Sequence, residues 1–382
     1  MSINSVGTLS SIAEVISGFA FKSSWFGSGM EKVVRISDFD NGVVTLEKAV
    51  TFDVKKHPVP SKYQICDGDI LVALSGATVG KIGVASSATA GAYLNQRVAI
   101  VRGHNKDNTN YLSFILRSNY MQQLLPSAEG AAQPNLSPKS LEYLPIPIPS
   151  IAVQRRIAAR LKAQLAAIEE ASNAAQHQLK ELTNLANAII RQSVEHPNTG
   201  SAQLGEVLDE VKQGIGTTWA DYPVLGATRA GLALAREPVG KSPERYKPVL
   251  HGTVFYNPMR IMIGSIAMVD EDDTPGITSP DYVALRGKPG LVDSRWFYYW
   301  LRSPYGVRCI ASLARGAVRE RMLFNRLAEG SLELPPYNVQ VTASKALAEL
   351  RPMRCAIEKQ RAEINLLPSK ILSKAFAIAT ND

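Results

Sequence analysis

The segment Asn257-Pro258-Met259-Arg260 is the part of this 382-residue sequence that comes nearest to a catalytic motif. It begins like the Asn-Pro-Pro-aromatic motif with which adenine methyltransferases hold a base flipped out of the duplex. Methionine, however, stands in place of the second proline, and arginine replaces the aromatic ring that would stack on the base. We therefore interpret the segment as a turn at the end of a strand, and we expect the chain itself not to methylate DNA.

A second candidate is the run of four carboxylates Asp270-Glu271-Asp272-Asp273, because Mg²⁺ in a nuclease prefers oxygen ligands of this kind. The run comes directly before a Thr-Pro-Gly sequence, and no second carboxylate cluster accompanies it. A solvated turn is therefore the expectation for this run of charges, rather than a metal site.

The other residues that could bind a metal or a cofactor lack the necessary spacing. The five histidines and three cysteines are His57, His104, His177, His196, His251, Cys66, Cys309 and Cys355. No histidine pairs recognisably with a cysteine, and the scattered, odd number of cysteines indicates free thiols. The glycine-rich residues 26–29 lack the strand-to-helix context of a cofactor-binding loop. The sequence thus predicts no catalytic residue, no metal and no cofactor held by this chain.

The sequence contains an internal repeat, which sets the elements that must position the polar residues. Gly68 and Gly80 recur 184 positions later as Gly252 and Gly264, each next to a short apolar run. The repeat further relates residues 99–103 to 283–287, residues 111–118 to 296–303, and residues 144–145 to 334–335. The aromatic residues 296–300 could stack on bases, but their counterpart in the first copy favours an amphipathic helix of the core.

A long segment with the heptad spacing of a coiled coil follows each copy of the repeat. The seam consists of Leu161, Leu165, Ile168, Ser172, Ala175, Leu179, Leu182, Ala186 and Ile189 in the first segment, and of Leu350, Ile357, Ile364, Ile371 and Ile378 in the second. The first helix, over about residues 151–194, would be roughly 65 Å long. Pro352 and Pro368 are expected to start or kink the second helix locally.

These patterns predict an α+β fold in which two repeated domains of mixed sheet and helix are separated by two long antiparallel coiled-coil helices. The predicted segments are residues 1–150 and 198–336 for the domains, and 151–197 and 337–382 for the helices. Because each helix has an apolar stripe that it cannot bury alone, the two helices should pack together with a domain at each end and a pseudo-twofold axis between them.

The composition limits the class of protein. The net charge of +8 favours a polyanionic partner, because lysine and arginine gain affinity by releasing the counterions of phosphates. The apolar fraction of 45% and charged fraction of 20% are typical of a soluble globular protein, and no run of apolar residues is long enough for a membrane helix. The N-terminus lacks the pattern of a secretory signal, so we expect a cytoplasmic protein without a membrane role.

Several blocks of the sequence resemble the specificity subunits of type I restriction-modification systems. They are residues 17–24, 33–39, 68–72, 75–81 and 93–98, and the block that runs from residues 133–137 through 144–149 to 154–157. The resemblance covers essentially the whole chain, in the order domain, helix, domain, helix. The second domain departs from the pattern at residues 315–321, where a Gln-Pro-Asn block would be expected, and has an abbreviated exit at residues 336–340.

This resemblance implies a non-catalytic DNA-binding subunit that serves in phage defence. Its two target recognition domains would each read half of a split double-stranded DNA target, with centres about one helical turn, ~34 Å, apart. The helices would set the gap and present surfaces to two copies of a methyltransferase subunit and to a translocase-nuclease subunit. S-adenosylmethionine would belong to the methyltransferase, which flips out the target adenine.

The candidate DNA contacts are polar loop residues that can donate to or accept from base edges and phosphates. In the first domain they are Lys22, Ser23, Ser24, Lys81, Gln96, Arg97, Gln133, Asn135 and Lys139. In the second they are Thr217, Thr218, Arg229, Arg260, Arg315, Arg319, Arg321 and Asn325.

Two other functions are open on the sequence. A non-catalytic scaffold that bridges protein partners without DNA specificity explains the repeat and the helices equally well, but it explains neither the basic balance nor the blocks of resemblance. A specificity protein that works only with a methyltransferase, without a nuclease partner, is the second. Strong salt dependence of duplex binding would separate DNA binding from the scaffold.

Overall fold

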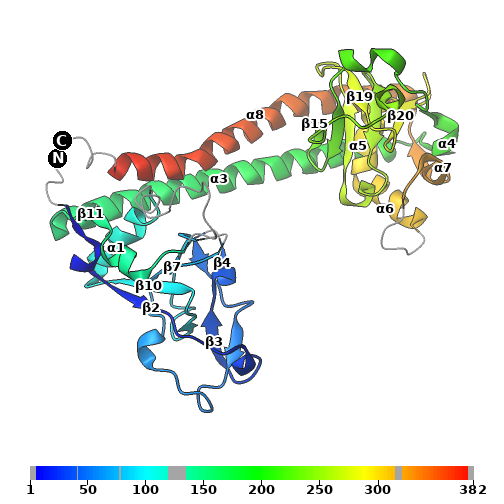
Figure 1. The fold of residues 1–382 in the computed structure, drawn as a ribbon. Helices are drawn as coiled ribbons and strands as arrows, with labels where there is room; N and C mark the ends of the chain where they lie inside the picture. Colours follow the sequence, from blue (N-terminus) through cyan, green and yellow to red (C-terminus); the bar gives the residue numbers. More distant parts are fainter. Residues whose placement is uncertain (1–5, 41, 77–78, 119–134, 315–320, 377–382) are drawn as a thin grey trace. The chain divides into compact units, whose positions relative to one another are not determined.

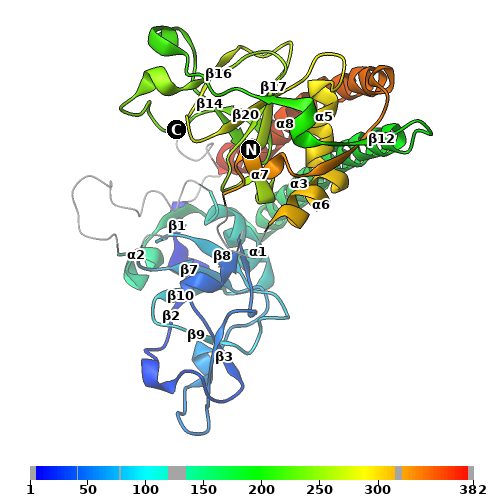
Figure 2. The ribbon, with the colours of Figure 1, turned by 90° about the vertical axis from the view of Figure 1, so that its right-hand side faces the viewer.

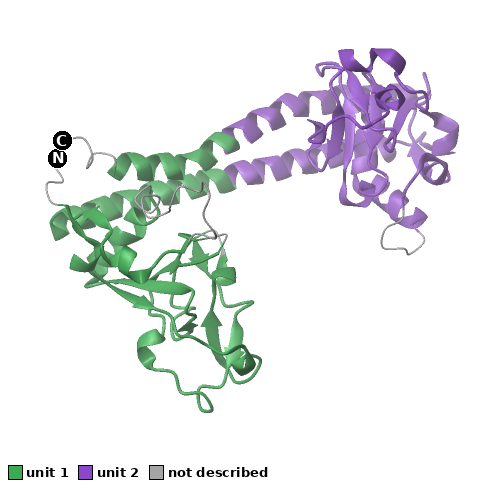
Figure 3. Ribbon diagram, in the orientation of Figure 1, with its two compact units in different colours: residues 1–173, 362–382 green, residues 174–361 purple. Residues whose placement is uncertain are grey.

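The structure of the chain is a computed structural model that describes residues 6–40, 42–76, 79–118, 135–314 and 321–376. By their contacts these residues divide into two units, residues 1–173 with 362–382 and residues 174–361 (Figure 3). Each unit contains one sheet domain and a part of both long helices, α3 (Ile151–Val194) and α8 (Tyr337–Phe376). The division of the chain into four segments, two domains and two helices, stays a prediction.

The first unit is built on a six-stranded sheet with the strand order β2-β10-β7-β8-β5-β4 (Figure 1). Its strands are β2 (Ala13–Ser17), β10 (Val98–Gly103), β7 (Ile70–Ala73), β8 (Ile82–Val84), β5 (Val43–Val44) and β4 (Phe39–Asp40). Neighbours are antiparallel except β5 and β8, which are parallel. In β7, Ile70 and Val72 pack into one apolar cluster, and Leu71 and Ala73 into another. The central strand is therefore covered on both faces, as its continuous apolar sequence requires.

Smaller elements complete this unit. They are the sheet of β3 (Glu31–Val34), β6 (Val50–Phe52) and β9 (Tyr93–Leu94), the pair β1 (Val6–Thr8) and β11 (Pro145–Pro147), the helices α1 (Lys106–Ile115) and α2 (Pro138–Glu142), and the 3₁₀ turns η1 (Leu9–Ser11), η2 (Ser23–Trp25), η3 (Ile36–Asp38) and η4 (Ser61–Tyr63). Figure 2 shows the strands β7, β8 and β10 side by side, with α1 next to them.

The second unit has a four-stranded sheet with the order β13-β20-β17-β18. Its strands are β13 (Leu208–Glu210), β20 (Val283–Gly287), β17 (Thr253–Tyr256) and β18 (Ile266–Val269). Three strand pairs accompany it: β12 (Gly200–Gln203) with β21 (Ser331–Leu334), β14 (Leu225–Thr228) with β15 (Gly231–Leu234), and β16 (Lys247–Val249) with β19 (Gly276–Thr278). The helices and 3₁₀ turns are α4 (Leu204–Val207), α5 (Ser294–Arg302), α6 (Pro304–Leu313), α7 (Phe324–Leu327), η6 (Gly216–Asp221), η7 (Pro243–Arg245) and η8 (Ile261–Ile263).

The repeat in the sequence corresponds to a repeat in the topology. The order β2-β10-β7-β8 in the first unit is the order β13-β20-β17-β18 in the second. Gly68 and Gly252, at the turns before β7 and β17, have φ values of 84° and 77°, in the left-handed region that favours glycine. The α+β fold class is confirmed, with one domain of mixed sheet and helix in each unit.

The long helices run antiparallel in both units. In the first unit, Leu161 of α3 shares an apolar cluster with Leu372 and Phe376 of α8, while Ser172 donates to Asn365 over 3.4 Å. In the second unit, Arg354 of α8 donates to the hydroxyl of Thr183 in α3 over 2.9 Å, and later residues of α3 share a cluster with earlier residues of α8. Rising numbers on one helix thus meet falling numbers on the other.

The large apolar residues predicted for the two seams are all at least half-buried in the described parts of α3 and α8. They are Leu161, Leu165, Ile168, Leu179, Leu182, Ile189, Leu350, Ile357, Ile364 and Ile371. Helix α8 continues through Pro352 and Pro368, so neither proline starts or ends it. Ile378 lies outside the described residues.

The aromatic segment 296–300 is part of the core, as predicted. Trp296, Phe297 and Trp300 of α5 are fully buried, and the Trp296 indole N–H donates to the hydroxyl of Ser193 in α3 over 2.8 Å. These rings are therefore unavailable for stacking on bases. Within the part of the chain that the structure describes, no helix is long and apolar enough to cross a membrane.

Candidate nucleic-acid interface

Three of the residues predicted to contact DNA line one pocket of the first unit. Gln96, Arg97 and Asn135 border a cavity of about 370 Å³ at the ends of β2, β7 and α2. Its other lining residues are Ser17, Leu74, Ser75, Leu136, Ser137 and Pro138. An arginine donates through a fork of N–H groups, while asparagine and glutamine amides both donate and accept. These are the groups that discriminate between base edges.

Backbone hydrogen bonds hold the walls of this pocket together. The N–H of Leu136 donates to the carbonyl of Leu74 over 2.7 Å, and the N–H of Leu74 donates to the carbonyl of Arg97 over 2.8 Å. The N–H of Gln96 donates to the carbonyl of Phe19 over 2.9 Å. Four segments far apart in the sequence are therefore fixed next to one another, and backbone hydrogen bonds hold the positions from which the polar side chains extend.

Gly18 allows two of these segments to approach closely. A Cβ atom at Gly18 would lie 2.0 Å from the carbonyl oxygen of Asn95, so no larger residue fits without moving the backbone. This contact ties the block at residues 17–24 to the block at residues 93–98, the two blocks singled out in the sequence.

Of the other first-domain candidates, Lys139 is exposed on α2, next to the pocket wall. Lys81 is half-buried, and its ammonium group donates to the carbonyl of Phe39 over 2.8 Å. Its charge is thus engaged in joining β4 to the turn before β8. Gln133 lies outside the described residues.

Lys22, Ser23 and Ser24 are exposed at the turn η2, beside an aromatic stack. The Trp25 ring stacks on the His57 ring at 4.3 Å between centroids with an angle of 3° between planes. The Lys22 ammonium lies 6.0 Å from the centroid of Trp25. Cations and flat rings in one place suit phosphates and nucleobases.

Sequence reasoning missed Lys55 and Lys56, the two exposed lysines that precede His57. The side chain of Asp53 accepts the backbone N–H groups of both lysines, at 2.9 and 3.3 Å, and so fixes their loop. The Lys-Lys-His run is visible in the sequence, but its contact with Trp25, 32 positions away, is not. We call Lys22, Trp25, Lys55, Lys56 and His57 the Trp25 cluster.

In the second unit, Arg321 occupies the place that Asn135 has in the first. The N–H of Met322 donates to the carbonyl of Pro258 over 3.1 Å, just as Leu136 donates to Leu74. Arg321 forms an ion pair with Asp281 at 3.1 Å. The strand registers place Asp281 where the first unit has Arg97. The same position therefore presents an exposed ion pair in one unit and a cation with an amide in the other.

The remaining second-domain candidates are scattered over separate turns. Thr217 and Thr218 are exposed on η6, the turn that also holds Trp219, and Asn325 is exposed on α7. Arg229 lies between β14 and β15, and its side chain donates to the carbonyl of Ile263 over 3.1 Å. Arg315 and Arg319 lie outside the described residues.

Arg260 is exposed in the turn that follows β17. In this turn the Asn257 side chain accepts the N–H of Met259 over 3.0 Å. The interpretation of this segment as a turn at the end of a strand is confirmed. Because Asn257 is engaged in the turn, it is not arranged to hold a flipped base.

A second pocket, of about 270 Å³, lies between α3 and α6 of the second unit and was not predicted. Arg191 and Arg308 line it together with Asn184, Asn187 and Tyr305. The guanidinium group of Arg308 lies 4.8 Å from the centroid of the Tyr305 ring. No sequence signal connects these residues, since they are brought together only by the packing of two helices.

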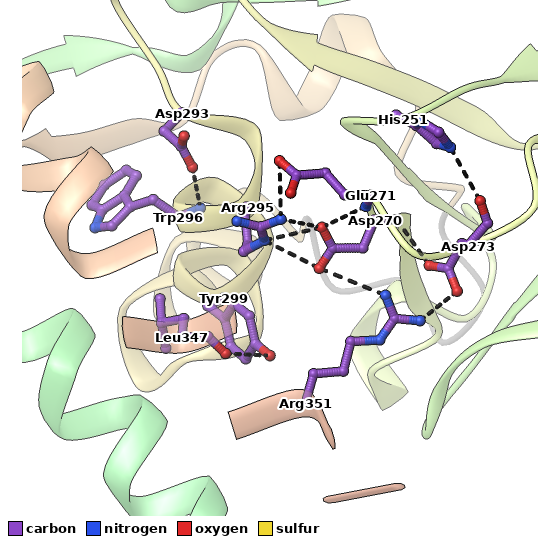
Figure 4. Close-up of polar contacts among 10 residues, drawn as sticks. All are labelled: His251, Asp270, Glu271, Asp273, Asp293, Arg295, Trp296, Tyr299, Leu347 and Arg351. Atoms are coloured by element: carbon purple, nitrogen blue, oxygen red, sulfur yellow. Dashed lines mark hydrogen bonds and ion pairs between the residues drawn. The ribbon is translucent and has the colours of Figure 1, made fainter. Parts of the chain in front are cut away.

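The expectation of a solvated turn at residues 270–273 is wrong for two of its four carboxylates (Figure 4). The Asp270 and Asp273 side chains are only 12% and 14% exposed. Arg295 of α5 donates to Asp270, and Arg351 of α8 donates to Asp273. The arginines come from sequence positions too distant to be associated with the turn beforehand. Glu271 and Asp272 are exposed, as expected.

No group of three or more histidine, cysteine, aspartate or glutamate side chains that could hold a metal ion occurs among the residues in the described ranges. Cys66, Cys309 and Cys355 are free. Burial raises the pKa of the Cys309 thiol, which makes it a poorer nucleophile at neutral pH.

Comparison with known proteins finds similarity to specificity subunits of type I restriction enzymes. Residues 3–178 match the family model described as the type I restriction modification DNA specificity domain. The chain is 22% identical over 420 residues to the type I restriction enzyme EcoBI specificity subunit of Escherichia coli, covering 97% of this chain and 84% of that protein. It is 25% identical over 157 residues to the EcoAI specificity subunit of Escherichia coli, covering 40% of this chain and 27% of that protein.

Solved structures share the fold over almost the whole chain. A chain from a structure that describes complex assembly and conformational transition of the type I R-M system has a TM-score of 0.65 and 18% identity, with 97% of each chain covered. The HsdS subunit from Thermoanaerobacter tengcongensis has a TM-score of 0.51 and 19% identity, with 97% of this chain and 96% of that chain covered. These similarities show that the α+β fold, with its two long helices, is a known one.

Proposed function

This chain is a DNA specificity subunit of the type I restriction-modification family, a non-catalytic role, and from that premise we propose that it reads a two-part DNA sequence, one half with each unit. In this proposal the chain contributes recognition, while chemistry is carried out by separate subunits. The helices α3 and α8 would set the gap between the two half-sites.

The observation that carries the proposal is the difference between two equivalent surfaces. The same edge of the sheet carries Arg97 and Asn135 in one unit and Asp281 and Arg321 in the other. Because base pairs are distinguished by the pattern of donors and acceptors, surfaces with such different groups would prefer different bases. Two related sites with different hydrogen-bonding groups favour an asymmetric, split target over a palindrome.

Within the first unit, Gln96, Arg97 and Asn135 are proposed to read base edges, with the pocket receiving part of the base pair. Lys139 and the lysines of the Trp25 cluster are exposed and flexible point charges, which suit phosphates. The net charge of +8 supports this division, since phosphate contacts supply much of the affinity and base contacts supply the discrimination.

The partners follow from the same proposal. We expect two copies of a methyltransferase subunit that holds S-adenosylmethionine, together with a translocase-nuclease subunit, and double-stranded DNA as the shared ligand. The assembly would act on DNA in the cytoplasm and contribute to defence against phage.

The test is to express this chain together with its methyltransferase subunit in cells that lack adenine methylation and to map methylated adenines by single-molecule sequencing. The proposal predicts one gapped, two-part motif that disappears when this chain is omitted. Methylation that is unchanged without the chain, from an otherwise intact methyltransferase, would favour the protein-bridging scaffold instead.

A further inference from the structure

Helix α8 is joined to the domain of the second unit by a cluster of alternating charges (Figure 4). The Nε of Arg295 donates to both carboxylate oxygens of Asp270, at 3.0 and 3.1 Å. Arg351, on α8, donates to Asp273, and its Nη1 atom lies 3.6 Å from the Oδ2 atom of Asp270. The backbone N–H of Asp270 donates to Asp273 over 2.8 Å. The two arginines and two aspartates form one connected network from α5 through the turn to α8.

The centre of the network is shielded from water, while Arg351 is partly exposed. The exposed fractions of the Arg295, Asp270 and Asp273 side chains are 15%, 12% and 14%, and that of Arg351 is 32%. Arg295 also lies 3.5 Å from the exposed carboxylate of Glu271. Burial alone would raise the pKa of Asp270, but hydrogen bonds from Arg295 and from the N–H of Glu271 lower it overall. The hydrogen bond to Asp270 likewise raises the pKa of Arg295. Asp270 and the two arginines therefore stay charged at neutral pH. Planar guanidinium forks then hold α8 in a defined direction.

Two further contacts align with Arg351 along α8. The Gln340 amide is fully buried, accepts the N–H of Asp293 over 3.0 Å and donates to the carbonyl of Pro335 over 2.8 Å. The Tyr299 hydroxyl donates to the carbonyl of Leu347 over 3.5 Å. The helix is thus fastened to the domain at three successive levels, of which Arg351 is the most distant from the start of the helix.

The first unit has a glutamine equivalent to Gln340, but it has a different residue at the position equivalent to Arg351. There Gln154 of α3 is buried, accepts the amide of Asn108 over 2.8 Å and donates to the carbonyl of Pro149 over 2.9 Å. Counting along the helices from these two glutamines places Leu165 where α8 has Arg351. Leu165 packs against the apolar cluster of the first unit. Apolar packing is non-directional, whereas the arginine fork fixes a direction.

Resting on the function proposed above, we propose that Arg351, held by Asp270 and Asp273, is a positioning residue that fixes the direction of α8 on the second domain and so sets the gap accepted between the two half-sites. From Arg351 to the end of α8 the helix extends roughly 38 Å at 1.5 Å per residue. A tilt of about 5° at the network would therefore displace the far end by about 3 Å, close to the ~3.4 Å rise of one base pair.

The experiment measures gap selectivity rather than activity alone. The chain is expressed with its methyltransferase subunit, and the DNA is a plasmid library that carries both half-sites at the native gap and at gaps shorter or longer by one and two base pairs. Arg351→Met keeps the stem of the side chain but removes the charge, and Asp273→Asn keeps the shape of its partner. Lys345→Met, at an exposed position of the same helix, is the matched control.

At gaps one base pair too short or too long, we expect both network variants to raise methylation, relative to the native gap, by about tenfold. This factor is in the range of the discrimination against one mismatched base pair. Arg351→Lys, which keeps the charge without the fork, should lie between the wild type and Arg351→Met, and Lys345→Met should match the wild type. If Arg351→Met does not fold, Asp273→Asn tests the same prediction.

Folded variants that keep the wild-type preference for one gap, or that lose methylation equally at all gaps, would show that the network only stabilises the unit. That outcome overturns the positioning role and leaves the proposed function intact. A wild-type protein without any gap preference would instead contradict the proposed function itself, so the two failures are distinguishable.

Discussion

The two units solve the same local problem, at the turn before the central strand, with different chemistry. In the first unit, Asp69 accepts the N–H of Cys66 over 2.7 Å and two N–H groups of Arg102, at 2.8 and 2.6 Å. In the second, the hydroxyl of Thr253 accepts the N–H of Leu250 over 3.1 Å and the Nε of Arg286 over 3.0 Å. The turn therefore requires an acceptor, and the strand beside it supplies an arginine in both cases.

The two acceptors differ in charge, so removing each of them should have a different effect on stability. The Asp69 side chain is 2% exposed and forms the ion pair of Arg102. Thr253 is neutral, and Arg286 is not paired through it. A repeat with the same backbone can thus depend on electrostatics in one copy and on a neutral hydrogen bond in the other.

Asp69→Ala should produce the largest loss of stability in this comparison. Removing one partner of a buried pair costs about 3–5 kcal/mol, and we expect about 3 kcal/mol because the side chain of Arg102 is 31% exposed. Thr253→Ala, which removes one neutral acceptor, should cost about 1 kcal/mol. Urea unfolding of the full chain measures both losses, and hydrogen exchange of β7 and β10 assigns the first to its unit.

Asp69→Thr sharpens this test, because it builds the second unit's solution into the first. It should lose clearly less stability than Asp69→Ala. If the two variants are equally unstable, the carboxylate and the hydroxyl are not equivalent acceptors at this turn, and the comparison of the two units is wrong.

Asp270→Asn should cost about 2 kcal/mol at pH 7, since asparagine still accepts one hydrogen bond but no longer balances two arginines. The effect depends on pH. The pKa of Asp270 is lowered in the folded state, whereas an unfolded aspartate titrates near ~3.9. The contribution of the carboxylate is therefore complete above about pH 4 to 5 and decreases as pH falls through the lower folded pKa.

Unfolding free energies of the wild type and Asp270→Asn, measured between pH 7 and pH 3, check this linkage. Their difference should stay constant from pH 7 to about pH 5 and shrink below about pH 4. Lys345→Met, outside the network, should show no such change in its difference from the wild type. A difference that grew on acidification would mean that Asp270 is protonated more easily in the folded state, contrary to its contacts.

Arg97→Ala should weaken recognition at one half-site only, by about 1.5 kcal/mol or about tenfold in affinity. Arg321→Ala should act on the other half-site, with a smaller effect, because part of its charge is already neutralised by Asp281 at 3.1 Å. Competition binding with DNA altered in one half-site at a time measures both. Equal effects of Arg97→Ala on the two half-sites would contradict the assignment of one half-site to each unit.

The same assignment can be tested at the scale of a domain. Exchanging residues 1–150 for those of a relative should change one half of the methylated motif and leave the other half and the gap as they were. A change in both halves would show that the units do not read independently.

The parts of this molecule that could be predicted are those with a local cause. Gly68 and Gly252 recur because each turn needs a left-handed residue, and the apolar runs after them become β7 and β17 because each strand is covered on both faces. The heptad seams of α3 and α8 were legible for the same reason, since helix geometry converts sequence spacing directly into a buried face.

The parts that could not be predicted depend on contacts between distant segments. Arg351 contacts Asp273 only because α8 packs on the domain with one particular rotation about its own axis, and no sequence periodicity predicts that rotation. Trp25 and His57 stack because η2 and the loop after β6 happen to be adjacent in the fold. For the pocket at Gln96, Arg97 and Asn135 the residue types were indicative, but their convergence required backbone hydrogen bonds between four distant segments.

The smallest expected difference in stability between the units concerns the N-terminal caps of α1 and α5, the helices that follow β10 and β20. Asn105 caps α1 by accepting the N–H of Asn108 over 3.0 Å, and Asp293 caps α5 by accepting the N–H of Trp296 over 2.9 Å. Replacing either cap by alanine should cost about 1 kcal/mol. Asp293→Ala should cost a few tenths of a kcal/mol more, because its charge also interacts with the helix dipole.

Salt separates these two contributions to capping. The dipole interaction of a charged cap is screened at high ionic strength, whereas the hydrogen bond of a neutral cap is not. The cost of Asp293→Ala should therefore fall towards that of Asn105→Ala when unfolding is measured in about 1 M salt. If the two costs respond equally to salt, the charge of Asp293 contributes nothing beyond its hydrogen bond, and the two helices are capped in the same way despite their different residues.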